Sequence, residues 1–406
     1  MKNEAALTGI RVIAFTHFAA GPIAAQYLGA LGADVIKIES PNRDLNRHAV
    51  RDLDDTLDGV SPYYLCTNRN QRCVVLNLKS EGGREVARKL IASSDVVLEN
   101  YRPGVLDKLS LGYDSARELK DDIVYCSFSA YDALGPGRDR PGQDLIMQAV
   151  SGLASLSGSS GGPPVPVGAY LIDGFTAMQG VIGILAALRY RDATGQGQWL
   201  RADMMSTALY MMTQEASFVM NASGMDTRSS AGVAHIHQGA PYGIYRAKDG
   251  DIAISVFGGG DVPRALAQAL GVEADIADYL SENGLKEHRD EVAGAFSIEI
   301  AKLTVDEAIA RLSPTGAWVV PVRTLGEALD DSVAVSANTI RTYSTPNVRE
   351  HRIVTEPLQM SQSPLRRDVP APAYAEHSVE LLNELGYDAT ETAKLIESGD
   401  VVSAES

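Results

Sequence analysis

The sequence predicts an α/β protein in which a large domain, built on a doubly wound parallel sheet, carries a smaller α+β domain. Strand-like and helix-like segments alternate between residues 9 and 128. The 406 residues exceed one ordinary hydrophobic core. A polar stretch near residue 222 is followed by two strand-like segments around a tight turn. We therefore expect a large domain in residues 1–221, a small domain in residues 222–316 and a return to the large domain in residues 317–406.

A βαβ unit opens the chain. Its predicted strands are Gly9–Phe15 and Ala33–Glu39, and a helix over Ile23–Leu31 follows Pro22. The second strand ends in an acidic residue, as in dinucleotide-binding folds. However, Gly21 stands alone in the first turn, where the fingerprint G-x-G-x-x-G would be needed. We therefore expect neither a nicotinamide nor a flavin cofactor.

The alternation continues beyond this unit and favours a Rossmann-like parallel sheet. Further strands are expected at Cys73–Leu78, Asp95–Glu99 and Ile123–Phe128, and a helix at Glu81–Ala92. Ligands of such sheets bind at the carboxyl ends of the strands. Basic residues such as Lys79 and Arg102 follow these ends in a chain of net charge −16. They indicate a phosphate site or are solvated surface residues, and the sequence leaves both interpretations open.

Composition limits the partners and the compartment. The net charge of −16 argues against nonspecific binding to nucleic acid or to an anionic membrane. The first residues lack the apolar core of a signal peptide. Cys66, Cys73 and Cys126 form no CxxC pair, and we expect small buried side chains in a reducing, cytoplasmic compartment. His235 and His237 lack further ligands at metal-binding spacing, so no metal is expected.

Asp173 stands at the start of a long apolar helix that ends in arginines and a Thr-Gly-Gln-Gly turn. The apolar run is expected to be a buried core helix, too short and too soon interrupted by arginines to span a membrane. Considered alone, Asp173 is an N-cap, because Asp accepts hydrogen bonds from the first-turn N–H groups. A helix N-terminus also keeps a carboxylate ionised, and an ionised carboxylate can act as a nucleophile. Both interpretations remain open at this point.

The segment before Asp173 contains a motif that matches a hydrolase pattern. Residues 151–168 are rich in Ser, Gly and Pro and should form a mobile loop. Within them, Gly158–Gly162 matches G-x-S-x-G around Ser160. A nucleophile elbow needs a strand before the serine and a helix after it, whereas Pro163 and Pro164 follow here. We therefore treat the match as chance.

The second half of the chain supplies the small domain and the C-terminal part. A linker is expected at Ala222–Gly232, and Gly258–Gly260 is expected to form a turn. The remaining predicted strands are Trp199–Asp203, His237–Tyr245, Asp251–Val256 and Ala317–Val322. The remaining predicted helices are Met205–Met220, several segments before Leu312, His377–Leu385 and Thr390–Ile396.

Several segments together carry a family resemblance. They are Ala33–Glu39, Asn68–Arg72, Leu76–Lys79, Asp95–Gly104, Gln143–Gly152, Asp173–Gly197, Ala240–Gly250 and Glu376–Tyr387. In this order they resemble the class III CoA-transferases (CaiB/BaiF type), which include formyl-CoA transferase, carnitine CoA-transferase and the 2-methylacyl-CoA racemases. The resemblance covers nearly the whole chain. It implies an interlocked homodimer of two ring-like subunits, with coenzyme A or acyl-CoA and a carboxylic acid as substrates.

The resemblance also implies a role for Asp173. In the implied mechanism, its carboxylate attacks the donor thioester to give an aspartyl anhydride, and CoA then converts this to an aspartyl-CoA thioester. An acceptor carboxylate reverses both steps. A carboxylate that is already ionised at pH 7 needs no general base, which fits a lone aspartate. Backbone N–H groups near Gly174 would stabilise the oxyanion.

CoA contacts carry over by position. The matching residues are Ala19, Ala20, Lys79, Asn100, Tyr101, Arg102, Lys108, Gln143 and Asp144. The basic residues match the nucleotide and phosphate end, and Gln143 with Asp144 match positions near the thioester. Ala19 replaces a glutamine of formyl-CoA transferase, and Ser40 replaces an arginine. The glycine-rich lid of that enzyme is reduced to Gln238 and Gly239, which disfavours formyl and oxalate specificity.

Three other functions compete with CoA transfer. A racemase or epimerase needs a histidine base where this chain has Gln143, and no histidine lies between His48 and His235. A noncatalytic CoA-binding subunit is disfavoured because Asp173 and the basic turns are intact. A hydrolase that uses Ser160 is weaker still. The identities of the donor and acceptor acids stay open, since Tyr170, Phe175 and Tyr242 suit a short dicarboxylate or a larger acid.

Overall fold

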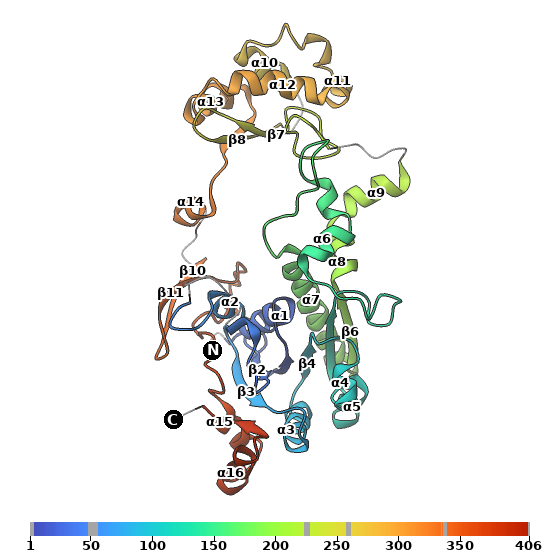
Figure 1. Ribbon diagram of the computed structural model, residues 1–406, viewed down its shortest axis with the longest axis vertical. Helices are drawn as coiled ribbons and strands as arrows, with labels where there is room; N and C mark the ends of the chain where they lie inside the picture. The colour runs from blue at the N-terminus through green and yellow to red at the C-terminus, as the bar shows by residue number, and fades with distance from the viewer. Residues whose placement is uncertain are drawn as a thin grey trace. The chain divides into compact units, whose positions relative to one another are not determined.

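A seven-stranded sheet lies at the centre of the larger of two units in the computed structural model, which describes residues 4–47, 56–222, 228–256, 261–333, 335 and 339–404 (Figure 1). In spatial order its strands are β12 (Val401–Val402), β3 (Arg72–Leu76), β2 (Asp34–Glu39), β1 (Arg11–Phe15), β4 (Val96–Glu99), β5 (Val124–Ser129) and β6 (Gln198–Asp203). All neighbours pair in parallel except β12, which is antiparallel to β3. The order 3-2-1-4-5-6 is that of a doubly wound sheet, so the predicted fold class is confirmed.

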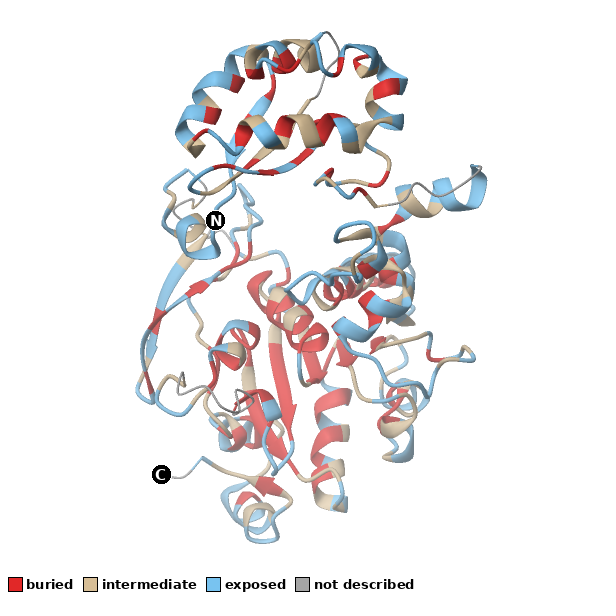
Figure 2. Cartoon of the chain, turned by 45° about the horizontal axis from the view of Figure 1, so that its top comes forward, coloured by how far each residue is buried: buried red, intermediate tan, exposed pale blue. Residues whose placement is uncertain are grey.

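Helices cover both faces of this sheet because strand side chains alternate between the faces. Val12 and Ala14 belong to the core under α1 (Ala20–Ala30) and α7 (Leu171–Thr194). Ile13 belongs to the opposite core. The helices on that side are α3 (Glu81–Ala92), α5 (Tyr113–Leu119) and α15 (Ser378–Glu384). The strands β1 to β5 are buried along nearly their whole length, as Figure 2 shows in red, whereas the edge strand β6 is only partly buried.

Shorter elements complete the larger unit. A hairpin of β10 (Ile340–Thr345) and β11 (Val348–Val354) packs on α2 through a small apolar cluster around Tyr64 and Tyr343. The others are η1 (Leu45–Arg47), α2 (Pro62–Thr67), α4 (Val105–Lys108), α8 (Met204–Met211) and α16 (Ala389–Glu397). The helix α6 (Asp144–Val150) begins in the larger unit after the β5 loop, and the short η2 (Leu153–Leu156) after it belongs to the smaller unit.

The helix α7 is longer than expected from its apolar run. It extends over 24 residues, and by length and composition it could cross a membrane, so the argument that it is too short was wrong. The arginines did not end it, because Arg191 lies inside the last turn and pairs with Asp95 at 2.9 Å. One side of α7 packs on β5, β6 and α1. Its position is that of a core helix of the sheet.

The smaller unit has its own hydrophobic core. Its antiparallel sheet has the order β7 (Gly243–Arg246), β8 (Asp251–Ser255) and β9 (Trp318–Pro321). Tyr245, Ile254 and Phe296 are central to the core between this sheet and its helices. The helices are α9 (Thr213–Asn221), α10 (Val262–Leu270), η3 (Ala277–Tyr279), α11 (Glu282–Glu287), α12 (Arg289–Ile300), α13 (Val305–Leu312), η4 (Ser313–Thr315) and α14 (Leu325–Asp330).

The division between the units differs in detail from the expected boundaries. The larger unit comprises residues 1–147, 169–211 and 335–406, and the smaller comprises residues 148–168 and 212–334. The strand expected at Ala317–Val322 pairs with β8, which places it in the smaller unit. The helix expected at Met205–Met220 is two helices separated at Met212. The strand expected from His237 begins only at Gly243, because Pro241 has no N–H for a ladder.

The cysteine prediction was right for two of three residues. Cys73 and Cys126 are buried in the sheet, whereas Cys66 lies on the exposed side of α2. The short α2 is only half covered by the β10–β11 hairpin, which explains the difference. The predicted turn at Gly258–Gly260 and residues 223–227 of the predicted linker lie outside the described residues.

Candidate active site

Asp173 lies in the first turn of α7, two residues after the helix begins at Leu171. Tyr170 occupies the N-cap position and makes no side-chain capping bond. The capping carboxylate comes instead from α6: the N–H groups of Ile172 and Asp173 donate to Oδ2 of Asp144 at 2.8 and 3.1 Å. The N-cap interpretation of Asp173 was therefore wrong. Its carboxylate is free for another role.

A second helix begins next to the Asp173 carboxylate. The helix α1 starts at Ala20 after the N-cap residue Ala19, and neither a capping side chain nor an acidic residue satisfies its first turn. The backbone N–H of Ala20 lies near enough to the Asp173 carboxylate to lower its pKa. Asp173 thus lies at the positive ends of two helices that pack against each other, α1 and α7. Of the residues predicted from the resemblance, Asp144 therefore binds the backbone of Asp173, and Ala20 lies near its carboxylate.

The pKa of Asp173 is raised from 3.8 to about 6. Burial is the largest cause, followed by the negative charge of Asp144, while the Ala20 N–H bond acts in the opposite direction. An ordinary carboxyl pKa was expected for Asp173 from the sequence, whereas the pKa in the folded protein is raised. At pH 7 most of the molecules still carry the ionised form, which is the nucleophilic one.

An aromatic pair borders the same carboxylate and was missed from the sequence. The Tyr63 ring on α2 lies against the Tyr170 ring, with centroids 5.7 Å apart. Burial raises the pKa of Tyr63, and the charges of Asp173 and Tyr170 raise it further. Its phenol therefore stays protonated and can donate a hydrogen bond. No sequence signal connects residues 63 and 173, since only the tertiary fold brings them together.

The turn after β4 meets the turn after β1. Both amide atoms of Asn100 bind the backbone of His17: Oδ1 accepts from His17 N at 3.0 Å and Nδ2 donates to His17 O at 2.7 Å. The His17 ring lies 5.1 Å from the Tyr101 ring and 5.0 Å from the Phe18 ring. Burial lowers the pKa of His17, so the ring is neutral at pH 7. These three rings form an apolar, stackable group that sequence reasoning identified only through Tyr101.

The predicted phosphate contacts lie at the carboxyl-end edge of the sheet. Lys79 follows β3, Arg102 follows β4, and Lys108 ends α4. All three are exposed, and no ion pair is recorded for them within the described parts of the chain. Their cationic groups are therefore accessible to an anion. Binding of a phosphate by these three residues stays a prediction.

The remaining predicted residues divide between the two units. Gln143 is exposed immediately before α6. Gln238 and Gly239 belong to the smaller unit, where a Cβ on Gly239 would come within 2.8 Å of the Leu285 backbone oxygen. Ala240 N also donates to Leu285 O at 3.0 Å. Gly239 is thus required by close packing on α11, whatever its role toward substrate.

The described residues offer no ribose-binding acid, serine nucleophile or metal cluster for the other chemistries considered. Glu39, the acid at the end of β2, pairs with Arg47 at 2.7 Å and is buried, so it is not available to a ribose. Ser160 lies in an exposed turn without a strand before it or a helix after it, which confirms that its motif is a chance match. Among the described residues, no group of three or more His, Cys, Asp and Glu side chains could hold a metal ion.

Comparisons with known proteins agree with this geometry. The family model "CoA-transferase family III" matches residues 7–378. A succinate–glutarate CoA-transferase of Agrobacterium fabrum is 31% identical, over 93% of this chain and 95% of the relative. A formyl-CoA:oxalate CoA-transferase of Streptomyces avermitilis is 30% identical, over 98% of this chain and 99% of the relative. A crystal structure of a CAIB/BAIF family protein from Brucella suis is similar with a TM-score of 0.82 and 28% identity, over 94% of this chain and 100% of that chain.

Proposed function

Because the chain belongs to CoA-transferase family III and is a CoA-transferase, we propose that it moves CoA from an acyl-CoA donor to a free carboxylic acid by way of Asp173. One observation carries this proposal. Asp173 is a half-buried carboxylate near the N-termini of α1 and α7. It does not cap α7, because Asp144 accepts the first-turn N–H bonds of that helix. A group that is costly to bury and has no structural task is a candidate for chemistry.

The proposed reaction begins with the ionised carboxylate. An oxygen of Asp173 attacks the carbonyl carbon of the donor thioester, the carbon–sulfur bond breaks, and CoA leaves as the thiolate. The thiolate then attacks the Asp173 carbonyl carbon of the anhydride, and the donor acid leaves as its carboxylate. The acceptor carboxylate attacks the resulting aspartyl-CoA thioester and releases the thiolate, which leaves a second mixed anhydride. The thiolate then attacks the acceptor carbonyl carbon of this anhydride, and the Asp173 carboxylate leaves. No proton transfer is needed, so a pKa of about 6 suffices at neutral pH.

The CoA site is proposed along the carboxyl-end edge of the sheet. Lys79, Arg102 and Lys108 would bind the phosphates as exposed cations. Tyr101, with the rings of His17 and Phe18, would stack on the adenine. Asn100 would act mainly through the His17 backbone that it holds, and Ala19 and Ala20 through their backbone.

The thioester end of the ligand is proposed to lie near Gln143 and Asp144, next to Asp173. Gln238 and Gly239 remain candidates for contact with the substrate. The backbone N–H groups of the first turns of α1 and α7, with the phenol of Tyr63, are candidate donors to the developing oxyanion.

The acceptor is proposed to be a dicarboxylic acid. The relatives described above are named for succinate, glutarate and oxalate, and another relative, from Haloarcula marismortui, is named a succinyl-CoA:mesaconate CoA-transferase (31% identity). Each of these acids has two carboxylates. One would attack the aspartyl-CoA thioester, and the other would need a cationic or hydrogen-bonding partner in the site.

A homodimer is also proposed. An apolar row runs along α7: Leu171, Phe175, Ile182 and Leu185 are exposed, and Met178, between them, is partly buried against the core of the sheet. Its spacing alternates between four and three residues, as in seams between packed helices. Four of these side chains are exposed in the single chain, with Ile182 at 59%. A second copy of the chain is the proposed partner for this row.

The test uses intact mass spectrometry. The protein is incubated with a panel of acyl-CoA donors, with and without hydroxylamine, and with dicarboxylic or monocarboxylic acceptors. We expect an adduct that is labile to hydroxylamine, that maps to Asp173 and that Asp173→Ala abolishes. Asp388→Ala is the matched control, because Asp388 also lies at a helix N-terminus but only caps α16. Tight CoA binding without any adduct, together with α-proton exchange in deuterated water, would instead indicate a racemase.

A further inference from the structure

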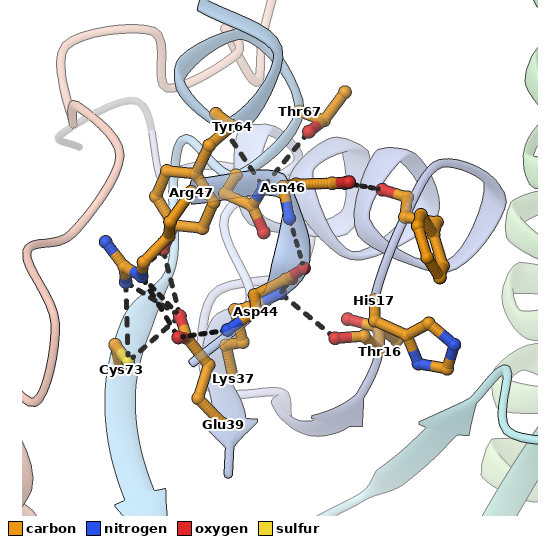
Figure 3. Close-up of polar contacts among 12 residues, drawn as sticks. Thr16, His17, Lys37, Glu39, Asp44, Asn46, Arg47, Tyr64, Thr67 and Cys73 are labelled. Carbon is orange, nitrogen blue, oxygen red and sulfur yellow. Dashed lines mark hydrogen bonds and ion pairs between the residues drawn. The ribbon is translucent and has the colours of Figure 1, made fainter. Parts of the chain in front are cut away.

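Two parallel strands end in a buried glutamate at the carboxyl edge of the sheet, Glu39 on β2 and Glu99 on β4. Figure 3 shows how the charge of the first is neutralised, since Glu39 pairs with Arg47 at 2.7 Å. Burial opposes the ionisation of Glu39, but Arg47 and the nearby Lys37 together hold its pKa below the ordinary value. A buried carboxylate at this edge is thus stabilised where the fold supplies cations.

Glu99 differs from Glu39 in its surroundings. In the parallel register its neighbours are Phe15 on β1 and Ser127 on β5, so the three side chains share one face of the sheet. Glu99 is 9% exposed, and its Oε2 accepts the backbone N–H of Tyr101 at 3.0 Å. Among the residues that the structure describes, no Lys, Arg or His pairs with it. A carboxyl group that is buried without a cation favours its protonated form.

The titratable groups around Glu99 belong to three parts of the larger unit. They are Tyr101 in the turn after β4, Asp107 on α4, and Tyr125 with Cys126 on β5. None of these four groups carries a positive charge in any protonation state. Burial is the main reason that the pKa of Glu99 is raised to about 7, and the Asp107 charge acts in the same direction, whereas the hydrogen-bond donors next to Glu99 oppose both. The protonated form of Glu99 is therefore well populated at neutral pH.

The turn that Glu99 holds is the one proposed to bind CoA. Tyr101 would stack on the adenine, and Arg102, which follows it, would bind a phosphate. We propose that Glu99 is a positioning residue that acts in its protonated form. It fixes the Tyr101 N–H through a carbonyl oxygen without placing a negative charge beside the phosphates of bound CoA. CoA binding is thereby coupled to the uptake of a proton by Glu99, an inference that rests on the proposed position of CoA at this turn.

The experiment compares the wild-type protein with Glu99→Gln and Glu118→Gln. At position 99, glutamine keeps an oxygen that can accept the Tyr101 N–H but carries no charge at any pH. Glu118→Gln is the matched control, because it removes the same charge from an exposed position on α5. CoA affinity is measured by isothermal titration calorimetry from about pH 6 to about pH 8.5, on both sides of the Glu99 pKa. Dephospho-CoA is titrated in parallel, because the 3′-phosphate of CoA itself titrates at about pH 6.

We expect the wild-type affinity for both ligands to fall about threefold to tenfold from the lower to the upper pH, relative to the affinity of Glu99→Gln. The sign follows from the charge, because Glu99 that has lost its proton repels the phosphates. At the lower pH the two proteins should bind equally within about twofold, since glutamine then resembles the protonated side chain. Glu118→Gln should follow the wild type. Any titration of His17, whose ring lies 5.1 Å from that of Tyr101, would remain in Glu99→Gln and so cancels in the ratio.

Parallel pH profiles of the wild type and Glu99→Gln would overturn the role of Glu99 alone, and so would a Glu99→Gln protein that binds CoA weakly at every pH. If Glu99→Gln does not fold, Asp107→Asn gives a second test. Loss of the neighbouring negative charge should shift the fall in affinity to lower pH, and an unshifted profile would overturn the inference. A wild-type protein that binds neither ligand at any pH would instead contradict the proposed CoA site itself.

Discussion

At the residue scale, the protonation state of Asp173 is set by opposing contributions, of which those that raise its pKa are the larger. Burial and the nearby Asp144 charge raise its pKa to about 6, and the Ala20 N–H limits the rise. Since only the ionised form attacks a thioester, adduct formation should increase as pH rises through about 6 and be constant above pH 7. Rates of adduct formation in a single turnover, measured between pH 4.5 and 8 (roughly two pH units on either side of the pKa), test this. A half-maximal rate near the ordinary aspartate value would contradict it.

Asp144 links the structure of α7 to this titration. Asp144→Asn keeps an oxygen that can accept from Ile172 and Asp173 N–H, but it removes the negative charge next to Asp173. We expect the Asp173 midpoint to fall below 6, with little change in Tm. Asp388→Asn, which alters a remote cap on α16, should leave the midpoint unchanged. A midpoint that stays at or above the wild-type value in Asp144→Asn would rule out the repulsion that we assign to Asp144.

The residues of the site were only partly predictable. Asp173 could be found because a helix start and a family pattern coincide in one segment. The family pattern also placed Asp144 near the thioester, but its capping bond to the Asp173 N–H, 29 positions away, was not predictable. The neighbouring Tyr63, 110 positions away, was not predictable either, because only the fold brings these residues together. Asn100 was predicted as a ligand contact, yet its amide is bonded to the His17 backbone. A sequence pattern can identify a residue as polar, but the partner of each of its hydrogen bonds depends on the tertiary fold.

At the scale of elements, the contact between α7 and β5 depends on a missing side chain. A Cβ at Gly180 would lie 2.2 Å from Phe128 Cζ, whereas one at Gly183 would meet Leu200 Cδ1 at an ordinary 3.6 Å. Gly180→Ala should therefore destabilise the protein by about 1–3 kcal/mol through overpacking. Gly183→Ala should stabilise it by about 0.5–1 kcal/mol through helix propensity. Urea unfolding of both variants measures the difference, and a stabilised Gly180→Ala would show that α7 packs less closely on the sheet.

The doubly wound parallel sheet could be predicted as a fold class, because strand-like segments alternate with helices and the strands are apolar on both faces. The pairing partner of β9, the strand at residues 318–321, could not be predicted. Of residues 318–321 only Val319 is buried, which does not identify the sheet, and only the pairing with β8 places them in the smaller unit. Period alone specifies a strand and its faces, but not its neighbour.

At the scale of the whole molecule, the same helix that carries Asp173 also carries the outward apolar row from Leu171 to Leu185. The sequence suggested a fully buried helix, but the single chain covers only one side of α7. Length and composition alone would also allow such a helix to enter a membrane. What covers the exposed side of α7 therefore decides whether this helix is a protein interface or a membrane segment. The proposed second copy would cover that side and leave the packing on the sheet intact.

This leads to a prediction about assembly. The wild-type protein should sediment at twice the 43.3 kDa chain mass, and Ile182→Glu should shift it toward 43.3 kDa, because a charge in the apolar row would have to be buried in the dimer. Ile298→Glu is the matched control, since Ile298 is similarly exposed, at 64%, but lies on α12 of the smaller unit. A dimer that persists in Ile182→Glu would exclude this row as the interface. If the dimer dissociates and adduct formation is also lost, assembly and chemistry depend on each other through α7, since Asp173 lies in its first turn.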